Sequence, residues 1–196
     1  MPRIAHIALK VEDLDKAAEF YEKVFSLSPV GKSRSEDRSR NRLSDGEIDL
    51  TFLKYDDDKS AMAQAAGEGP CIHHFAIEVD DLDKYVVAVR KFGCEILGDP
   101  AIPPVKFRVP GGPLAEIVPT GRYQKKRDPE KSTTGRIVHL AMRVDGLDKT
   151  SDFLAQVFGL TRVKVPGVRE TARYLTDGTV HIAINKVDVG TKEHKG

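Results

Sequence analysis

Three histidines that stand in matching sequence contexts are the residues of this chain best suited to chemistry. His6, His74 and His139 each open a short apolar run, and each run leads through one or two acidic residues to Leu-Asp-Lys. Such a recurrence at nearly equal intervals predicts an internal structural repeat. Imidazole nitrogens bind metal ions and exchange protons near neutral pH. The repeat therefore carries a reactive group at one fixed position.

A second polar residue follows each histidine at nearly the same interval. Asp49, Glu116 and His181 each lie in the middle of an apolar run. A buried carboxylate is costly without a compensating group, so the two acidic positions call for one. A divalent metal ion between the first two repeats would provide it, and the predicted ligands are His6, Asp49, His74 and Glu116.

This ligand set suits one divalent ion such as Zn²⁺, Ni²⁺, Co²⁺, Mn²⁺ or Fe²⁺, with positions left for water or substrate. A small-molecule substrate with two adjacent oxygens could chelate the ion, which would polarise a carbonyl and stabilise an enediolate or enolate. Removal of the proton next to a carbonyl is the chemistry that these residues favour. The alternative is that each histidine is a core residue hydrogen-bonded to a neighbouring carboxylate.

Strands and helices of one recurring unit must position these side chains. Residues 4–11 alternate as in a half-buried strand, which places His6 on the same face as Ala8. Asp13 can cap the helix that follows, and three short strands separated by turn signals complete the unit. The sequence predicts an α+β fold of three repeated βαβββ modules, with the first two paired around the metal site.

Changes in composition set the predicted boundaries. The segments are a paired domain over 1–120 with modules 1–66 and 70–120, a linker over 121–135, a third module over 136–188 and a polar tail over 189–196.

The third module has no partner module within the predicted domains. An unpaired module leaves a sheet face or edge open to water, so this module is predicted to lie at the interface of a homodimer. A second metal site is predicted where two copies of His139 and His181 would meet. A third module that serves only as the contact between chains is the alternative.

Composition excludes several classes of partner. The chain has 196 residues and a net charge of +1, which favours neither a nucleic acid nor a membrane surface as partner. It has no apolar run of the roughly 20 residues that a membrane helix needs and no signal peptide, so a cytoplasmic location is expected. Cys71 and Cys94 are too few and too far apart for a disulfide framework, and both are expected to be reduced.

The repeats and their polar positions resemble the vicinal oxygen chelate superfamily, which includes glyoxalase I, methylmalonyl-CoA epimerase, the type I extradiol dioxygenases and the bleomycin and fosfomycin resistance proteins. The matching segments are residues 6–14, 48–51, 67–80 and 115–118. Glyoxalase-like and epimerase-like members bind metal through a first-strand histidine and a fourth-strand Glu or Gln of one module, and through a histidine and a Glu of its partner.

The resemblance implies roles for the four predicted ligands. Glu116 is the candidate catalytic base, because a carboxylate ligand in glyoxalase-like sites can leave the metal to take the proton. Asp49 is the candidate second acid or base, and its short side chain departs from the pattern of the superfamily. If Asp49 is not a ligand, His6, His74 and Glu116 remain as the two-histidine, one-carboxylate set that dioxygenases use for Fe²⁺.

Three function classes follow from the resemblance. The first is a metal-dependent lyase or isomerase that is glyoxalase-like or epimerase-like; the alternatives are an Fe(II) extradiol-type dioxygenase and a small-molecule binding or antibiotic-resistance protein. His73 is expected to point to the opposite strand face from His74 and to be structural. A cluster of arginines could hold an anionic group of the substrate, or could form a solvated edge; its members are Arg34, Arg38, Arg40 and Arg42.

Overall fold

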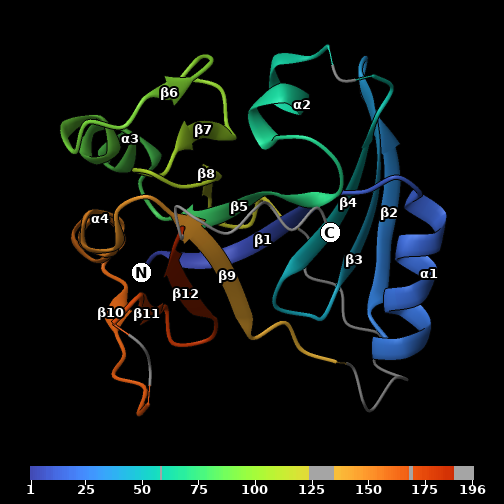
Figure 1. The fold of residues 1–196 in the computed structure, drawn as a ribbon. Coiled ribbons are helices and arrows are strands. Elements are labelled where there is room, and N and C mark those ends of the chain that lie inside the picture. The colour runs from blue at the N-terminus through green and yellow to red at the C-terminus, as the bar shows by residue number, and fades with distance from the viewer. Residues whose placement is uncertain (58, 124–134, 168–169, 188–196) are drawn as a thin grey trace. The chain divides into compact units, whose positions relative to one another are not determined.

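A computed structural model describes residues 1–57, 59–123, 135–167 and 170–187. Its helices are α1 (Leu14–Phe25), α2 (Ala61–Ala66), α3 (Leu82–Lys91) and α4 (Leu147–Phe158). Its strands are β1 (Arg3–Lys10), β2 (Ser28–Arg34), β3 (Arg38–Ser44), β4 (Asp49–Tyr55), β5 (Cys71–Val79), β6 (Ile96–Leu97), β7 (Val105–Arg108), β8 (Leu114–Pro119), β9 (His139–Val144), β10 (Thr161–Arg162), β11 (Ala172–Thr176) and β12 (His181–Lys186). The order strand, helix, strand, strand, strand recurs along the chain, and the predicted α+β class is confirmed (Figure 1).

The chain divides into two compact units. Unit 1 contains residues 1–3, 78–120 and 138–196, and unit 2 contains residues 4–77 and 121–137. Each unit is therefore built from segments that are not contiguous in the sequence. The predicted polar tail and most of the predicted linker lie outside the described residues, and the predicted domain boundaries stay a prediction.

Unit 2 is built around strands in the order β2-β3-β4-β1-β5. Strand β1 is parallel to β4 with His6 opposite Asp49, and β3 is antiparallel to both β2 and β4. Because partners in register share a sheet face, His6 and Asp49 lie on one side of the sheet. Helix α1 packs on β3 and β4 from the other side, where the Tyr21 ring meets Phe52 with centroids 5.3 Å apart (Figure 1).

Local signals explain where α1 begins and ends. The Asp13 side chain accepts hydrogen bonds from the backbone N–H groups of Asp15 and Lys16, at 3.1 and 3.0 Å, which satisfies two donors of the first turn. Ser26 ends the helix with φ of 55°, a left-handed conformation that glycine adopts more readily.

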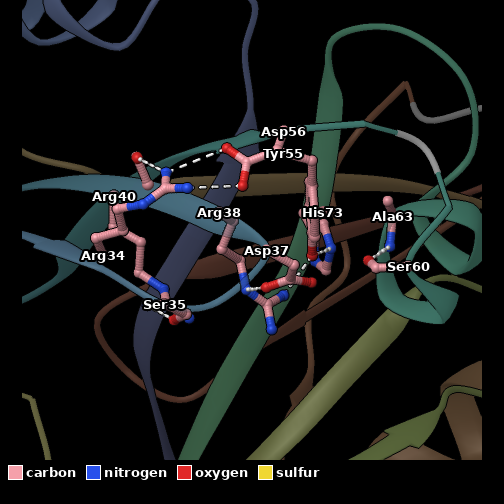
Figure 2. Close-up of polar contacts among 11 residues, drawn as sticks. Arg34, Ser35, Asp37, Arg38, Arg40, Tyr55, Asp56, Ser60, Ala63 and His73 are labelled. Carbon is pink, nitrogen blue, oxygen red and sulfur yellow. Dashed lines mark hydrogen bonds and ion pairs between the residues drawn. The ribbon is translucent and has the colours of Figure 1, made fainter.

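Helix α2 was not predicted from the sequence. It joins β4 to β5, and the Ser60 hydroxyl accepts a hydrogen bond from the backbone N–H of Ala63 at its start (Figure 2). The alanine-rich sequence Ala-Met-Ala-Gln-Ala-Ala has high intrinsic helix propensity but no strong apolar period. Propensity and a cap, rather than a packing stripe, therefore explain this helix.

Unit 1 contains two sets of strands. Strands β8, β7 and β6 are neighbours in that order, while β10, β11, β12 and β9 form a separate four-stranded sheet with β12 parallel to β9. Helix α3 packs on β8, helix α4 packs on β11 and β12, and the two helices contact each other. The second and third predicted modules therefore share one core.

Aromatic side chains fill that shared core. Phe153 and Phe158 of α4 are buried and contact Phe92 and Phe107 with ring centroids 5.1 to 6.1 Å apart. Tyr85 of α3 stacks on Phe158 at 5.7 Å. Buried aromatic pairs contribute more than their buried area alone, so this cluster is a main source of stability in unit 1. No helix in the described ranges is both long enough and apolar enough to cross a membrane.

Candidate metal centre

His6 lies in the middle of β1 and is held from the neighbouring strand. The parallel register places it opposite Asp49 of β4, and its Nδ1 is 2.9 Å from the Asp49 Oδ1. Both side chains are buried, with 3% and 0% of the residue exposed. A histidine with Nδ1 on a carboxylate has its ring orientation fixed and presents Nε2 as the nitrogen that can bind an ion.

Asp49 is engaged by three side chains. In addition to His6, the Thr51 hydroxyl donates to Oδ1 at 2.8 Å, and Arg42 donates through Nε and a terminal nitrogen to Oδ2 at 3.1 and 2.6 Å. Burial by itself would raise the pKa of Asp49, but the hydrogen bond from His6 and the Arg42 guanidinium hold it below the usual range of aspartate. Asp49 is therefore an ionised carboxylate whose two oxygens are both bound by protein donors.

His74 and His73 of β5 lie against each other. A hydrogen bond of 2.7 Å joins their Nδ1 atoms, and their rings meet edge to face with centroids 4.9 Å apart. His73 was expected on the opposite strand face from His74, but the two rings are nevertheless in contact. His74 is also near His6, with ring centroids 5.2 Å apart. The two predicted histidine ligands of unit 2 are therefore neighbours.

Tyr123 is a site residue that the sequence reading missed. It belongs to the segment predicted as an exposed linker, but its ring stacks on His6 with centroids 4.2 Å apart and an angle of 5° between the planes. Tyrosine at this position has no periodic or motif context in the sequence. The only available signal was an aromatic residue in an otherwise polar segment.

Glu116, the fourth predicted ligand, lies in unit 1. It occupies the middle of β8 between Ala115 and Ile117, with 1% of the residue exposed. Its register neighbour on the antiparallel strand β7 is Lys106. The expectation of a buried carboxylate is thus correct for both Glu116 and Asp49, although Asp49 begins β4 rather than lying in the middle of it.

The third predicted pair forms the same register. His139 of β9 lies opposite His181 of β12, and both residues are exposed. Buried and exposed residues alternate along β9, so His139 occupies the face of β9 opposite its buried residues, whereas Ile182, Ala183 and Ile184 of β12 are all buried. A second metal site at these residues and a homodimer through this module stay predictions.

Comparison with known proteins assigns this chain to a family. Residues 3–106 match the model of the Glyoxalase/Bleomycin resistance protein/Dioxygenase superfamily, which is more than half of the chain. The chain belongs to this superfamily. The resemblance drawn from the repeated histidine segments is therefore confirmed.

Individual members of the superfamily resemble the chain over most of its length. A lactoylglutathione lyase from Arabidopsis thaliana is 30% identical over 81% of this chain and 55% of its own length. A Mn(II)-bound glyoxalase from Novosphingobium aromaticivorans superposes with a TM-score of 0.68 at 19% identity, covering 95% of this chain and 63% of that one. A mutant of 4-hydroxymandelate synthase from Streptomyces coelicolor gives a TM-score of 0.73, with the same identity and coverage. These structures share the fold, and the chain spans about half the length of the plant lyase.

The four arginines of the predicted cluster have different partners. Arg34 forms a two-point ion pair with Asp56, and Arg42 forms one with Asp49. Arg38 donates to the Tyr55 hydroxyl, and Arg40 donates to the hydroxyl of Ser35 (Figure 2). Arg42 thus contacts the candidate metal centre through Asp49, a contact that the charge pattern alone did not indicate.

Proposed function

We propose that this chain is a divalent-metal-dependent lyase or isomerase that transfers a proton next to a carbonyl group of a small molecule. The proposal rests on one observation above all: the buried His6 and His74 are neighbours, and the Nδ1 atom of each is held by a protein group. Metal-binding histidines commonly have one nitrogen anchored in this way, so that the other nitrogen faces the ion. Two such rings fit a shared divalent ion.

Glu116 is proposed as the third ligand on the strength of the repeat. The first module sets His6 opposite Asp49, and the third sets His139 opposite His181. The same register in the second module would set His74 opposite Glu116. A metal held by His6, His74 and Glu116 would have two neutral ligands and one anionic ligand, a set that suits Zn²⁺, Mn²⁺, Ni²⁺, Co²⁺ or Fe²⁺.

Asp49 then acts through His6 rather than as a direct ligand. Its oxygens already accept hydrogen bonds from His6, Thr51 and Arg42. Its negative charge favours the proton on Nδ1 of His6, which keeps Nε2 available for the ion.

The bound metal would polarise the substrate carbonyl and thereby acidify the adjacent C–H bond. Glu116 is the proposed base for that proton, since a buried carboxylate ligand can leave the metal and accept it. Tyr123 holds the His6 ring in one plane by stacking on it. The plant relatives named as lactoylglutathione lyases support a thiol adduct of a 2-oxoaldehyde as the first substrate to test.

The test begins with elemental analysis of protein purified without a histidine tag. One divalent ion per chain is expected, and turnover of 2-oxoaldehyde thiol adducts or epimerisation of 2-methyl acyl thioesters should disappear on chelation and return with metal. Glu116→Gln should retain much of the metal affinity and lose turnover, because the amide keeps an oxygen ligand but cannot take the proton. Metal-free protein whose stability does not change on chelation would refute the proposal and favour a binding protein instead.

An Fe(II) dioxygenase is the second candidate. The engagement of Asp49 by protein donors favours it, because the ligands then reduce to two histidines and one carboxylate, which is the set that non-haem iron enzymes use. Oxygen uptake with catechol-type substrates, measured on the Fe²⁺-loaded protein, distinguishes this activity from proton transfer.

A further inference from the structure

The two histidines of the proposed metal centre are anchored by different groups. His6 is held by the carboxylate of Asp49, whereas His74 is held by the imidazole ring of His73. An imidazole ring can hold a metal ligand in place only if it is itself fixed. The surroundings of His73 therefore decide how firmly His74 is oriented.

His73 is fixed by a hydrogen bond to a tyrosine. Its Nε2 is 2.7 Å from the hydroxyl oxygen of Tyr55, and the two rings are close to parallel with centroids 5.6 Å apart (Figure 2). His73 is 1% exposed and Tyr55 is 8% exposed. Both ring nitrogens of His73 are thus engaged by neighbouring side chains in a buried position.

Tyr55 is anchored in turn from the adjacent strand. Arg38, its register partner on β3, donates a hydrogen bond to the Tyr55 hydroxyl, and the guanidinium carbon lies 5.0 Å from the centroid of the ring. Asp37 forms an ion pair with Arg38 at 3.1 Å (Figure 2). A series of contacts therefore links the buried His74 to the partly exposed Arg38 of β3, by way of His73 and Tyr55.

We propose that His73 is the positioning residue for His74, and that Tyr55 and Arg38 hold His73 in place. This inference rests on the proposed function, because it takes His74 as a metal ligand. When His74 binds an ion through Nε2, its remaining proton is on Nδ1, and Nδ1 donates to the Nδ1 of His73. His73 then carries its own proton on Nε2 and donates it to the oxygen of Tyr55, which also accepts from Arg38. The N–H groups of His74, His73 and Arg38 that link the series each meet an acceptor, so the orientation of His74 is specified.

The test measures Mn²⁺ affinity by calorimetry on the full chain, with the thermal stability of the metal-free protein measured in parallel. His73→Leu removes the acceptor, and Tyr55→Phe removes only the oxygen that holds His73. Each should weaken Mn²⁺ binding about 10-fold or more, as loss of a hydrogen-bond partner behind a metal ligand commonly does. His73→Asn places an amide oxygen near the position of Nδ1 and should restore most of the affinity.

Tyr85→Phe is the matched control. Tyr85 is as exposed as Tyr55, at 8%, but lies on α3 in unit 1. Its variant should bind Mn²⁺ as the unmodified protein does. His73→Leu or Tyr55→Phe with unchanged affinity would overturn the inference, and so would a loss that His73→Asn fails to restore.

His74→Ala distinguishes failure of this inference from failure of the proposed function. If His74→Ala leaves Mn²⁺ affinity unchanged, His74 is not a ligand and both proposals fall. If His74→Ala abolishes binding while His73→Leu and Tyr55→Phe do not weaken it, the metal site stands and only the positioning role is lost. Should His73→Leu not fold, Tyr55→Phe alone carries the test, since it removes a single oxygen atom.

Discussion

His6 and Asp49 act as one group at the scale of single residues. The carboxylate fixes the imidazole, and Arg42 and Thr51 fix the carboxylate. Asp49→Ala should therefore weaken metal binding about 10- to 100-fold, because His6 would lose the acceptor that orients it. Calorimetric titration with Mn²⁺ measures this effect.

Asp49→Asn separates the two roles considered for Asp49. An asparagine oxygen can still accept from His6, so this variant should bind metal much more tightly than Asp49→Ala does if Asp49 acts through His6. If Asp49 is instead a direct ligand whose charge offsets that of the ion, asparagine keeps an oxygen ligand but loses that charge, so its metal affinity should fall well below that of the unmodified protein. The comparison requires the stability of both metal-free variants, because Arg42 loses its ion pair in each.

Cys94 allows a test that is independent of the metal. Burial raises the pKa of its thiol to about 11, and burial also raises the pKa of Cys71. The thiolate is the reactive form, so at pH 8 Cys94 in the folded protein should be alkylated on the order of a hundredfold more slowly than an unfolded cysteine. Mass spectrometry after timed iodoacetamide treatment checks this, and rapid labelling of the folded chain would contradict it.

The helices of the recurring units differ in how they begin. The side chains of Asp13 and Asp81 cap α1 and α3, whereas Gly146 precedes α4 and offers no side-chain hydrogen bond. Gly146 has φ of −135°, which any residue can adopt, and a Cβ there would meet only Lys149 at an ordinary contact distance of 3.7 Å. This position therefore tolerates the aspartate found at the other two.

Gly146→Asp should stabilise the protein by about 0.5 to 1 kcal/mol, from the new cap and from the reduced freedom of the unfolded chain. Urea denaturation measures the change in the free energy of unfolding. Asp13→Gly is the converse control and should lower stability by a similar amount. No gain at residue 146 would show that the acidic neighbours Asp145 and Asp148 offset the cap.

The sequence predicted contacts within a module better than those between distant segments. The interval between His6 and Asp49 is nearly the same as the interval within each of the other two pairs. This spacing predicted that His6 and Asp49 lie in register, and they do so on parallel strands of one module. The contact between His73 and His74 was not predicted, because strand alternation fixes the Cβ direction but leaves the ring free to turn toward His74. Tyr123 was missed, because its stacking on His6 depends on tertiary folding alone.

At the scale of the whole chain, the third module supplies aromatic surface to unit 1. Phe153 and Phe158 cover Phe92, Phe107 and Tyr85. Deleting residues 138–196 should therefore cause aggregation, because rings that are now in contact with α4 would face water. Light scattering checks this, and a soluble truncated chain with unchanged association would contradict it.

Phe153→Ala is the milder form of the same experiment. Phe153 is fully buried, so the variant should lose about 3 to 5 kcal/mol of stability through lost burial and the cavity left behind. Static light scattering of the unmodified chain gives its molecular mass in solution. It therefore separates a third module that acts only within unit 1 from one that also forms the predicted homodimer. A dimer that dissociates on dilution would add an intermolecular role for the third module.

Ribosomal synthesis proceeds from the N-terminus, so the last part of unit 2 emerges after residues 78–120 of unit 1. The end of this last part, residues 135–137, is bound to the earlier part of unit 2 by two hydrogen bonds. The backbone N–H of Gly135 donates to the Phe25 carbonyl, and that of Ile137 donates to the Asp45 carboxylate. A nascent chain that ends at residue 120 already contains His6 and His74, but Tyr123 has not yet been added. Its two histidines would meet cellular metal ions without the aromatic ring that stacks on His6 in the finished protein.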